Sequence, residues 1–223
     1  MTLEVLLVDN HLLAVAKPAG LPVVPDSSGD ESLYDQAREW IRREYAKPGE
    51  VFLGVVHRLD RPVSGVVLFG RTSKAASRLS EQFRSHSVRK LYFGVSATAP
   101  RASEGELVQW LTKDEARNVV SASSTERNGS QRSVTRWRLA GNDARFFHLD
   151  LEPSTGRPHQ LRVAAASLGC PLLGDLKYGA AVPLPDQSVG LHAALLEVDH
   201  PTLKTRVVVR APVPERDWWS WRR

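Results

Sequence analysis

The sequence predicts an α+β fold, a largely antiparallel mixed β-sheet with helices packed on it. Two observations lead to this prediction: strand-like segments outnumber helical ones, and many neighbouring strand segments are separated only by short turns. A chain of 223 residues with 42% hydrophobic residues can form one sizeable core or two small lobes. We find no internal repeat and expect a single domain over residues 1–223.

The expected strands are short apolar runs, rich in β-branched residues and bounded by turn residues. Asp9, Asn10 and His11 form the turn of the first hairpin, and the two prolines and glycine of Lys17–Pro22 require an irregular loop. The nine runs are Glu4–Val8, Leu12–Ala16, Val63–Phe69, Leu91–Ala97, Gly105–Leu111, Ser133–Leu139, Arg145–Leu151, Leu191–Asp199 and Thr205–Arg210.

Three segments have helical periodicity. The first runs from Ser32 to about Lys47, the second is capped by Thr72, and the third starts near Pro158 and ends by Gly169. The residues expected to face the core are Leu33, Ala37, Trp40, Ile41 and Tyr45 in the first helix and Ala76, Leu79 and Phe83 in the second.

Two segments fit no core element. Lys113–Arg132 is rich in serine, asparagine and charge, which suits either a solvated hairpin extension or an RNA contact. The aromatic and basic tail Trp218–Arg223 is expected to pack on the body of the protein, although its rings could also stack on bases.

Composition narrows the class of protein. Thirty Lys and Arg against 25 Asp and Glu give a net charge of +5, which favours polyanionic partners such as nucleic acid. The single cysteine, Cys170, excludes an internal disulfide and suits a reducing compartment. No apolar run reaches the roughly 20 residues of a membrane-spanning helix. We therefore expect a cytoplasmic protein without membrane contact, and a monomer.

The segment His57–Gly65 carries the first candidate for chemistry. Asp60 lies between Arg58 and Arg61 in a short turn that enters a strand. Nearby positive charge keeps a carboxylate ionised even when it is partly buried, so Asp60 could act as a nucleophile, a base or a metal ligand. The turn taken alone is equally compatible with a structural salt bridge.

The second candidate is Ser154–Val163, a loop followed by a helix start, with arginines, a histidine and a glutamine. Helix N-termini favour anions, and Arg162 near the first turn could reach a carboxylate from another segment. In the third candidate, Arg89–Val95, strand alternation places Lys90 and Tyr92 on one face. Tyr92 could stack on a base, carry a proton or simply pack in the core.

Taken together, these segments resemble the pseudouridine synthases of the RluA type, which act on ribosomal and transfer RNA. The resemblance runs in order through nearly the whole chain, and six matching blocks are far more specific than one. The blocks are Val15–Gly20, His57–Gly65, Lys90 with Tyr92, Thr155–Val163, Gly174–Gly179 and Leu191–Ala193. It implies the pseudouridine synthase catalytic fold, here without the small N-terminal RNA-binding domain of some relatives.

The resemblance also implies roles for individual residues. Asp60 is the catalytic carboxylate, Arg162 pairs with it, and Tyr92 lies against the target uracil as a candidate for the proton step. Arg58 helps to displace the target base from its stack. Residues expected to bind the substrate beside Arg58 are Lys90, Arg157, His159 and Gln160.

Uridine and pseudouridine contain the same atoms, so the isomerisation requires no cofactor. The sequence agrees, since it has neither a Walker loop nor a dinucleotide-binding fingerprint. His57, His159 and His192 lie far apart and lack close metal-ligand spacing, so we expect no metal and assign them to holding neighbouring groups. Two other functions stay open: a non-catalytic RNA-binding module, and a glycoside or nucleoside hydrolase, which would usually need a second carboxylate.

Overall fold

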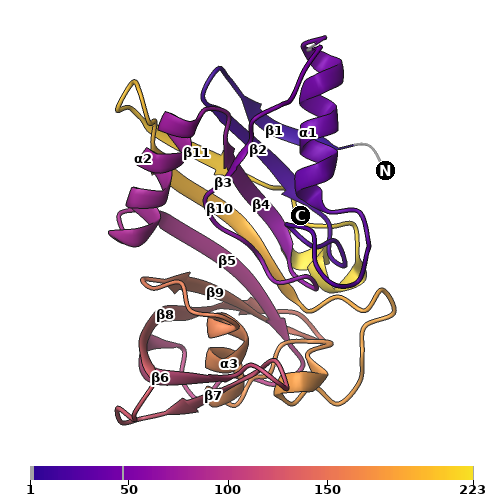
Figure 1. Ribbon diagram of the computed structural model, residues 1–223. Coiled ribbons are helices and arrows are strands. Elements are labelled where there is room, and N and C mark those ends of the chain that lie inside the picture. The colour runs from indigo at the N-terminus through magenta and orange to yellow at the C-terminus, as the bar shows by residue number, and fades with distance from the viewer. Residues whose placement is uncertain (1–2, 47, 223) are drawn as a thin grey trace. The chain divides into compact units, whose positions relative to one another are not determined.

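The computed structural model describes residues 3–46 and 48–222, which form two compact units (Figure 1). Unit 1 extends to Arg89 and resumes over Ala193–Pro214; unit 2 comprises Lys90–His192 and the segment from Glu215. The predicted α+β class with mostly antiparallel strands is confirmed. The expected single catalytic domain stays a prediction. No helix of the described residues is long and apolar enough to cross a membrane.

Unit 1 contains a sheet in the order β1-β2-β4-β10, with β3 added to β4 and β11 to β10. The pairings β1–β2, β2–β4, β3–β4 and β10–β11 are antiparallel. A buried apolar cluster that includes Leu12, Leu68, Leu79 and Val198 forms its core. The elements are β1 Glu4–Val8, β2 Leu12–Lys17, α1 Leu33–Glu44, β3 Gly54–Val55, β4 Ser64–Gly70, α2 Ser73–Arg84, β10 Leu191–Asp199 and β11 Arg206–Arg210.

Unit 2 contains a sheet in the order β5-β9-β8-β6-β7, with every neighbouring pair antiparallel. Helix α3 contacts β7, β8 and β9, and a smaller apolar cluster of Leu111, Val120 and Val163 lies beneath it. The elements are β5 Arg89–Ser96, β6 Glu104–Asp114, β7 Val119–Ser123, β8 Gln131–Asn142, β9 Phe147–Pro153, α3 Gln160–Ser167 and the 3-10 turns η1 Leu176–Tyr178 and η2 Asp217–Arg222.

Both predicted helix starts in unit 1 are confirmed. Ser32 accepts a hydrogen bond from the Asp35 backbone and the Asp35 carboxylate accepts one from Ser32, which is a capping box. Thr72 accepts from the Ala75 backbone at the start of α2. Tyr45, expected in the core, is instead 42% exposed just after α1, where it lies under the Arg71 guanidinium. Lys47, where the first helix was expected to end, lies outside the described residues.

Of three expectations for unit 2, the first needs correction and the other two are confirmed. Helix α3 begins at Gln160 rather than near Pro158, because His159 adopts a left-handed conformation with φ of 51° that helical residues cannot share. Lys113–Arg132 forms a hairpin extension, in which β7 pairs with the end of β6. The described part of the tail packs: Trp219 is buried, and the Trp221 ring stacks on His148.

Candidate active site

The turn that carries Asp60 is fixed by a buried lysine of the neighbouring strand. The Lys17 amine, only 1% exposed, donates to the backbone carbonyls of Pro18, Leu21 and Arg61 at 2.9, 2.7 and 3.0 Å. The Val63 amide donates to the Asp60 carbonyl at 3.0 Å and closes the turn. Lys17 therefore connects the loop after β2 to the chain directly beside Asp60.

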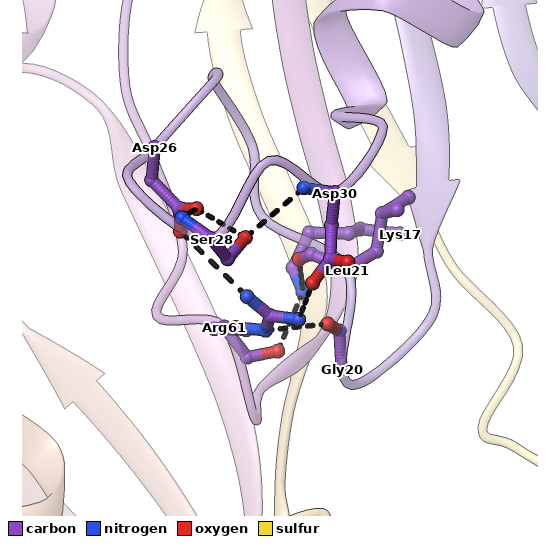
Figure 2. Close-up of polar contacts among 7 residues, drawn as sticks. All are labelled: Lys17, Gly20, Leu21, Asp26, Ser28, Asp30 and Arg61. Atoms are coloured by element: carbon purple, nitrogen blue, oxygen red, sulfur yellow. Dashed lines mark hydrogen bonds and ion pairs between the residues drawn. The ribbon is translucent and has the colours of Figure 1, made fainter.

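Arg61 extends this connection toward solvent (Figure 2). Its Nε donates to the Gly20 carbonyl at 2.9 Å, its guanidinium bonds to Asp30, and Asp26 lies 3.8 Å away. The Gly20 amide donates a hydrogen bond to the Arg61 carbonyl at 2.8 Å. The loop from Gly20 to Asp30 is thus tied to the Asp60 turn through both the backbone and the side chain of Arg61.

Charge around this turn is closely balanced. Burial lowers the pKa of Lys17 to about 7, the Asp60 carboxylate opposes that fall, and Arg61 adds to it. Hydrogen bonds from Ser28 hold the pKa of Asp26 below its usual value, with help from the cations Arg61 and Arg58. Asp60 is half-buried and Arg58 is exposed, so an anionic substrate can reach the arginine.

Gly65 ends the motif at a place where only glycine fits. Its φ is +121°, and a Cβ there would lie 2.3 Å from the Ala193 carbonyl oxygen on β10. His57 holds the same motif from the other end: its Nε2 accepts from the Leu68 amide at 2.9 Å, and its ring stacks on Phe83 at 4.6 Å. These contacts fit the expectation that His57 holds neighbouring groups.

In unit 2, the segment around Arg162 forms a buried ion pair. Arg162 is 6% exposed, and its guanidinium binds Asp175 bidentately, with Nε to Oδ2 at 2.8 Å and Nη2 to Oδ1 at 2.7 Å. The Tyr178 ring lies 5.1 Å from the Arg162 guanidinium carbon. The Tyr178 hydroxyl accepts from the Val120 amide at 2.9 Å and shares a 2.6 Å hydrogen bond with Nδ1 of His159.

Lys90 and Tyr92 share one face of β5, as the alternation predicts. Tyr92 pairs with Leu151 of β9 and is half-buried. The Lys90 amine donates to the Thr155 carbonyl at 2.9 Å, which fixes the loop before α3, and burial lowers the pKa of Lys90 to about 8. Lys90 therefore lies in the same network of contacts as the start of α3.

The structure thus brings five of the predicted residues into one region of unit 2. Tyr92 follows Lys90 by two positions on the same strand, whereas Asp60 and Arg58 belong to unit 1. The predicted pair of Asp60 with Arg162 stays a prediction. The five residues are Lys90, Arg157, His159, Gln160 and Arg162.

Sequence analysis gave no role to Lys17, Asp175 or Tyr178. All three lie in blocks that resemble the family, Val15–Gly20 and Gly174–Gly179, so this resemblance could have drawn attention to them. Their long-range partners could not be predicted, because Arg61, Arg162 and Val120 lie 44, 13 and 58 residues away from them in the sequence. Among the described residues, no group of three or more His, Cys, Asp or Glu side chains could hold a metal ion.

Comparison with solved structures shows which fold the protein has. The chain superposes on human RNA pseudouridylate synthase domain containing 4 with a TM-score of 0.78, covering 95% of this chain and 89% of that one at 24% identity. This likeness shows the fold, the catalytic fold that the sequence predicts.

Comparison of sequences then shows the family. The family model of RNA pseudouridylate synthases matches residues 11–167. The chain is 33% identical to ribosomal large subunit pseudouridine synthase D of Xylella fastidiosa, over 96% of this chain and 66% of that protein. It is 32% identical to tRNA pseudouridine synthase C of Salmonella typhimurium, over 96% of this chain and 86% of that one. The chain belongs to the RNA pseudouridine synthases of the RluA type, a family of isomerases that act on RNA.

Proposed function

We propose that this protein isomerises specific uridines of structured ribosomal or transfer RNA to pseudouridine, with Asp60 as the catalytic carboxylate and Arg162 as its partner. The observation that carries the proposal is the turn of Asp60, held by Lys17 and Arg61 within a chain that matches the family along nearly its whole length. The names of the relatives, one ribosomal and one transfer RNA enzyme, support both classes of substrate.

The chemistry needs only groups that the chain itself supplies. The N1–C1′ bond breaks, the base turns, and a C5–C1′ bond forms while the C5 proton is lost and N1 gains one, so atoms balance. The Asp60 carboxylate either adds to the sugar or removes a sugar proton to assist cleavage. In either route it must be ionised, and the cations Arg58 and Arg61 flank it in the chain.

Four further residues complete the proposed site. Tyr92 lies against the uracil and assists loss of the C5 proton, a contribution of about 10²–10⁴ in rate for positioned acid–base groups. Arg58 fills the space left by the flipped base, whose extrusion costs a few kcal/mol. Arg157 and His159 bind the RNA near the start of α3. Loops and bulges, where bases are already unstacked, are the preferred targets. The enzyme acts as a cytoplasmic monomer.

The proposed reaction is tested by measuring release of the hydrogen at uridine C5. RNA labelled with tritium at uridine C5 releases tritium to water on each turnover, so wild-type protein is expected to release it and Asp60→Asn to release none. Asp26→Asn, in the loop of the same unit, is the matched control and should keep full turnover. Release by Asp60→Asn at the wild-type rate would overturn the assignment of Asp60.

The same reactions separate the alternatives. A non-catalytic RNA-binding module would bind RNA without releasing tritium, and a hydrolase would produce free uracil. Asp60→Asn is expected to keep wild-type RNA affinity, because the isosteric amide removes the reacting oxygen and leaves the phosphate-binding cations unchanged.

A further inference from the structure

Gln160, the first residue of α3, has a side-chain amide that is almost entirely buried, with the residue 4% exposed. We propose that Gln160 is a positioning residue, which holds the loop Ser154–His159 in one conformation for the RNA and makes no contact with the RNA itself. The inference rests on the proposed function and reassigns one residue that the sequence placed among the substrate contacts.

The hydrogen bonds of Gln160 leave its amide no capacity for a ligand. Its Oε1 accepts from the Thr155 hydroxyl at 2.8 Å and from the Arg157 amide at 3.0 Å. Its Nε2 donates to the Val134 carbonyl at 2.9 Å and to the Thr135 hydroxyl at 3.0 Å. A primary amide has two donor hydrogens and two acceptor sites, and all four are used.

The orientation of the amide is fixed by its partners. An exchange of oxygen and nitrogen would set the amino group against the Arg157 amide, a donor against a donor, and the oxygen against the Val134 carbonyl. The Thr155 hydroxyl gives its hydrogen to Gln160 and accepts from the Val134 amide at 3.1 Å. Gln160 therefore joins the loop to β8 through two consecutive residues of that strand, and only one orientation satisfies every group.

Besides Gln160, two other residues fix the loop Ser154–His159, and part of the loop is accessible. Lys90 of β5 donates to the Thr155 carbonyl at 2.9 Å, and Arg157 Nε donates to the Arg132 carbonyl at 3.1 Å. A Cβ built on Gly156 would meet no atom within 4 Å. Gly156 and the remaining guanidinium nitrogens of Arg157 are thus the parts of the loop that an RNA backbone can approach.

Two substitutions of Gln160 separate positioning from contact. Gln160→Leu removes all four hydrogen bonds at similar volume. Gln160→Glu keeps both acceptor sites but sets a carboxylate oxygen against the Val134 carbonyl. Gln109→Leu is the matched control: Gln109 is also buried in unit 2, at 8% exposed, but bonds to Ser167 of α3 at 2.8 Å and not to the loop.

The first measurement is amide hydrogen exchange of the free protein. In Gln160→Leu and Gln160→Glu the Arg157 amide is expected to exchange at least about tenfold faster than in wild type, because its acceptor is lost or displaced. The Gln109 variant should leave that rate unchanged. Wild-type exchange at Arg157 in both Gln160 variants would overturn the proposal, whatever their activity.

The second measurement is tritium release under single-turnover conditions. Both Gln160 variants are expected to lose about 10²-fold in rate, as a displaced positioning element can cost, with RNA affinity changed less than about threefold. Lowering the pH from about 8 to about 6 should raise the rate of Gln160→Glu relative to wild type, because a protonated carboxyl can again donate to the Val134 carbonyl. Loss of RNA affinity together with wild-type exchange at Arg157 would indicate direct contact and overturn the proposal.

Failure of the proposed function has a different signature. If the wild-type protein released no tritium from any RNA, the reaction assigned to the family site would fail. The exchange result would still report whether Gln160 holds the loop.

Discussion

The turn of Asp60 in unit 1 and the start of α3 in unit 2 are held by opposite strategies. In unit 1, Lys17 donates only to backbone carbonyls, and the outer contacts of Arg61 are exposed ion pairs, with the Arg61 side chain 43% exposed. In unit 2, Arg162 is held by the carboxylate of Asp175 inside the protein, and Gln160 by hydroxyls and amides. The Asp60 turn therefore depends mainly on backbone carbonyls, which any residue supplies. The start of α3 depends on particular side chains.

This difference sets the cost of losing a contact in each unit. A buried ion pair that loses one member leaves an uncompensated charge, whereas an exposed pair is screened by water and salt. Loss of a buried amine that donates to backbone carbonyls should cost an intermediate free energy, because water can replace some of its hydrogen bonds. The free energy lost on substitution should therefore fall from buried ion pairs, through buried amines, to exposed ion pairs.

Asp175→Ala is expected to lower the free energy of unfolding by about 3–5 kcal/mol, because Arg162 would stay buried without this counter-charge. Urea unfolding measures the loss. Asp186→Ala removes the more exposed pair with Arg216 at 2.9 Å in the same unit and should cost about 1 kcal/mol or less. Equal losses in the two variants would contradict the ranking of buried over exposed pairs.

Lys17→Met is expected to cost about 3 kcal/mol, since three backbone carbonyls lose their donor. The loss should also depend on pH. Burial lowers the pKa of Lys17 from the usual 10.5 to about 7, so between these values the unfolded chain holds more protons and the stability of wild type rises with pH.

The methionine variant lacks this rise, so its deficit should grow from about pH 7 to about pH 10, by at most about 1.4 kcal/mol per pH unit. Urea titrations of both proteins at several pH values measure it. A deficit that shrinks as pH rises would contradict the assignment to Lys17.

Tyr178→Phe is expected to cost about 1–3 kcal/mol, because the Val120 amide and Nδ1 of His159 lose the hydroxyl that they share. The tritium-release rate should fall as well, since His159, which we propose binds the RNA, loses the hydroxyl that holds its ring. Tyr34→Phe, whose ring packs on Phe69 in unit 1, provides the control for removal of a hydroxyl. No difference between the two variants would show that the network around Arg162 does not depend on this oxygen.

Asp30→Asn should have the smallest effect, because its pair with Arg61 is exposed. We expect a small fall in the urea midpoint at low salt that disappears at high salt. A loss as large as that of Lys17→Met, or one that salt does not reduce, would show that side-chain pairs rather than backbone contacts hold the Asp60 turn.

Much of the fold could be predicted from sequence because its signals are local. The caps Ser32 and Thr72 bond three residues ahead, and short apolar runs bounded by turn residues identified nine strands within a few residues of their observed bounds. The short β3 and the hairpin strand β7 were missed, because polar or two-residue strands depend on a partner rather than on their own composition. The start of α3 was placed too early because local composition does not mark His159 as left-handed, and its side-chain partner Tyr178 lies 19 residues further along.

The candidate site was predicted residue by residue, but not contact by contact. Asp60, Arg162 and Gln160 were all singled out, and none of the partners now seen could be inferred from spacing. Arg162 was expected to pair with a carboxylate from another segment, and the structure supplies Asp175 as one such carboxylate. Charged residues can be identified from the local sequence, whereas their contacts depend on the three-dimensional fold.

The order in which the chain builds its two units has a consequence for synthesis. Unit 1 needs Ala193–Pro214 and unit 2 needs the segment that follows, in which Trp219 and Arg222 pack on His192 and Phe93. Many proteins fold one domain at a time as the chain emerges from the ribosome. Here unit 1 obtains its last segment, Ala193–Pro214, only after Lys90–His192 of unit 2 has been translated. Unit 2 in turn obtains its last segment, from Glu215 onward, after unit 1.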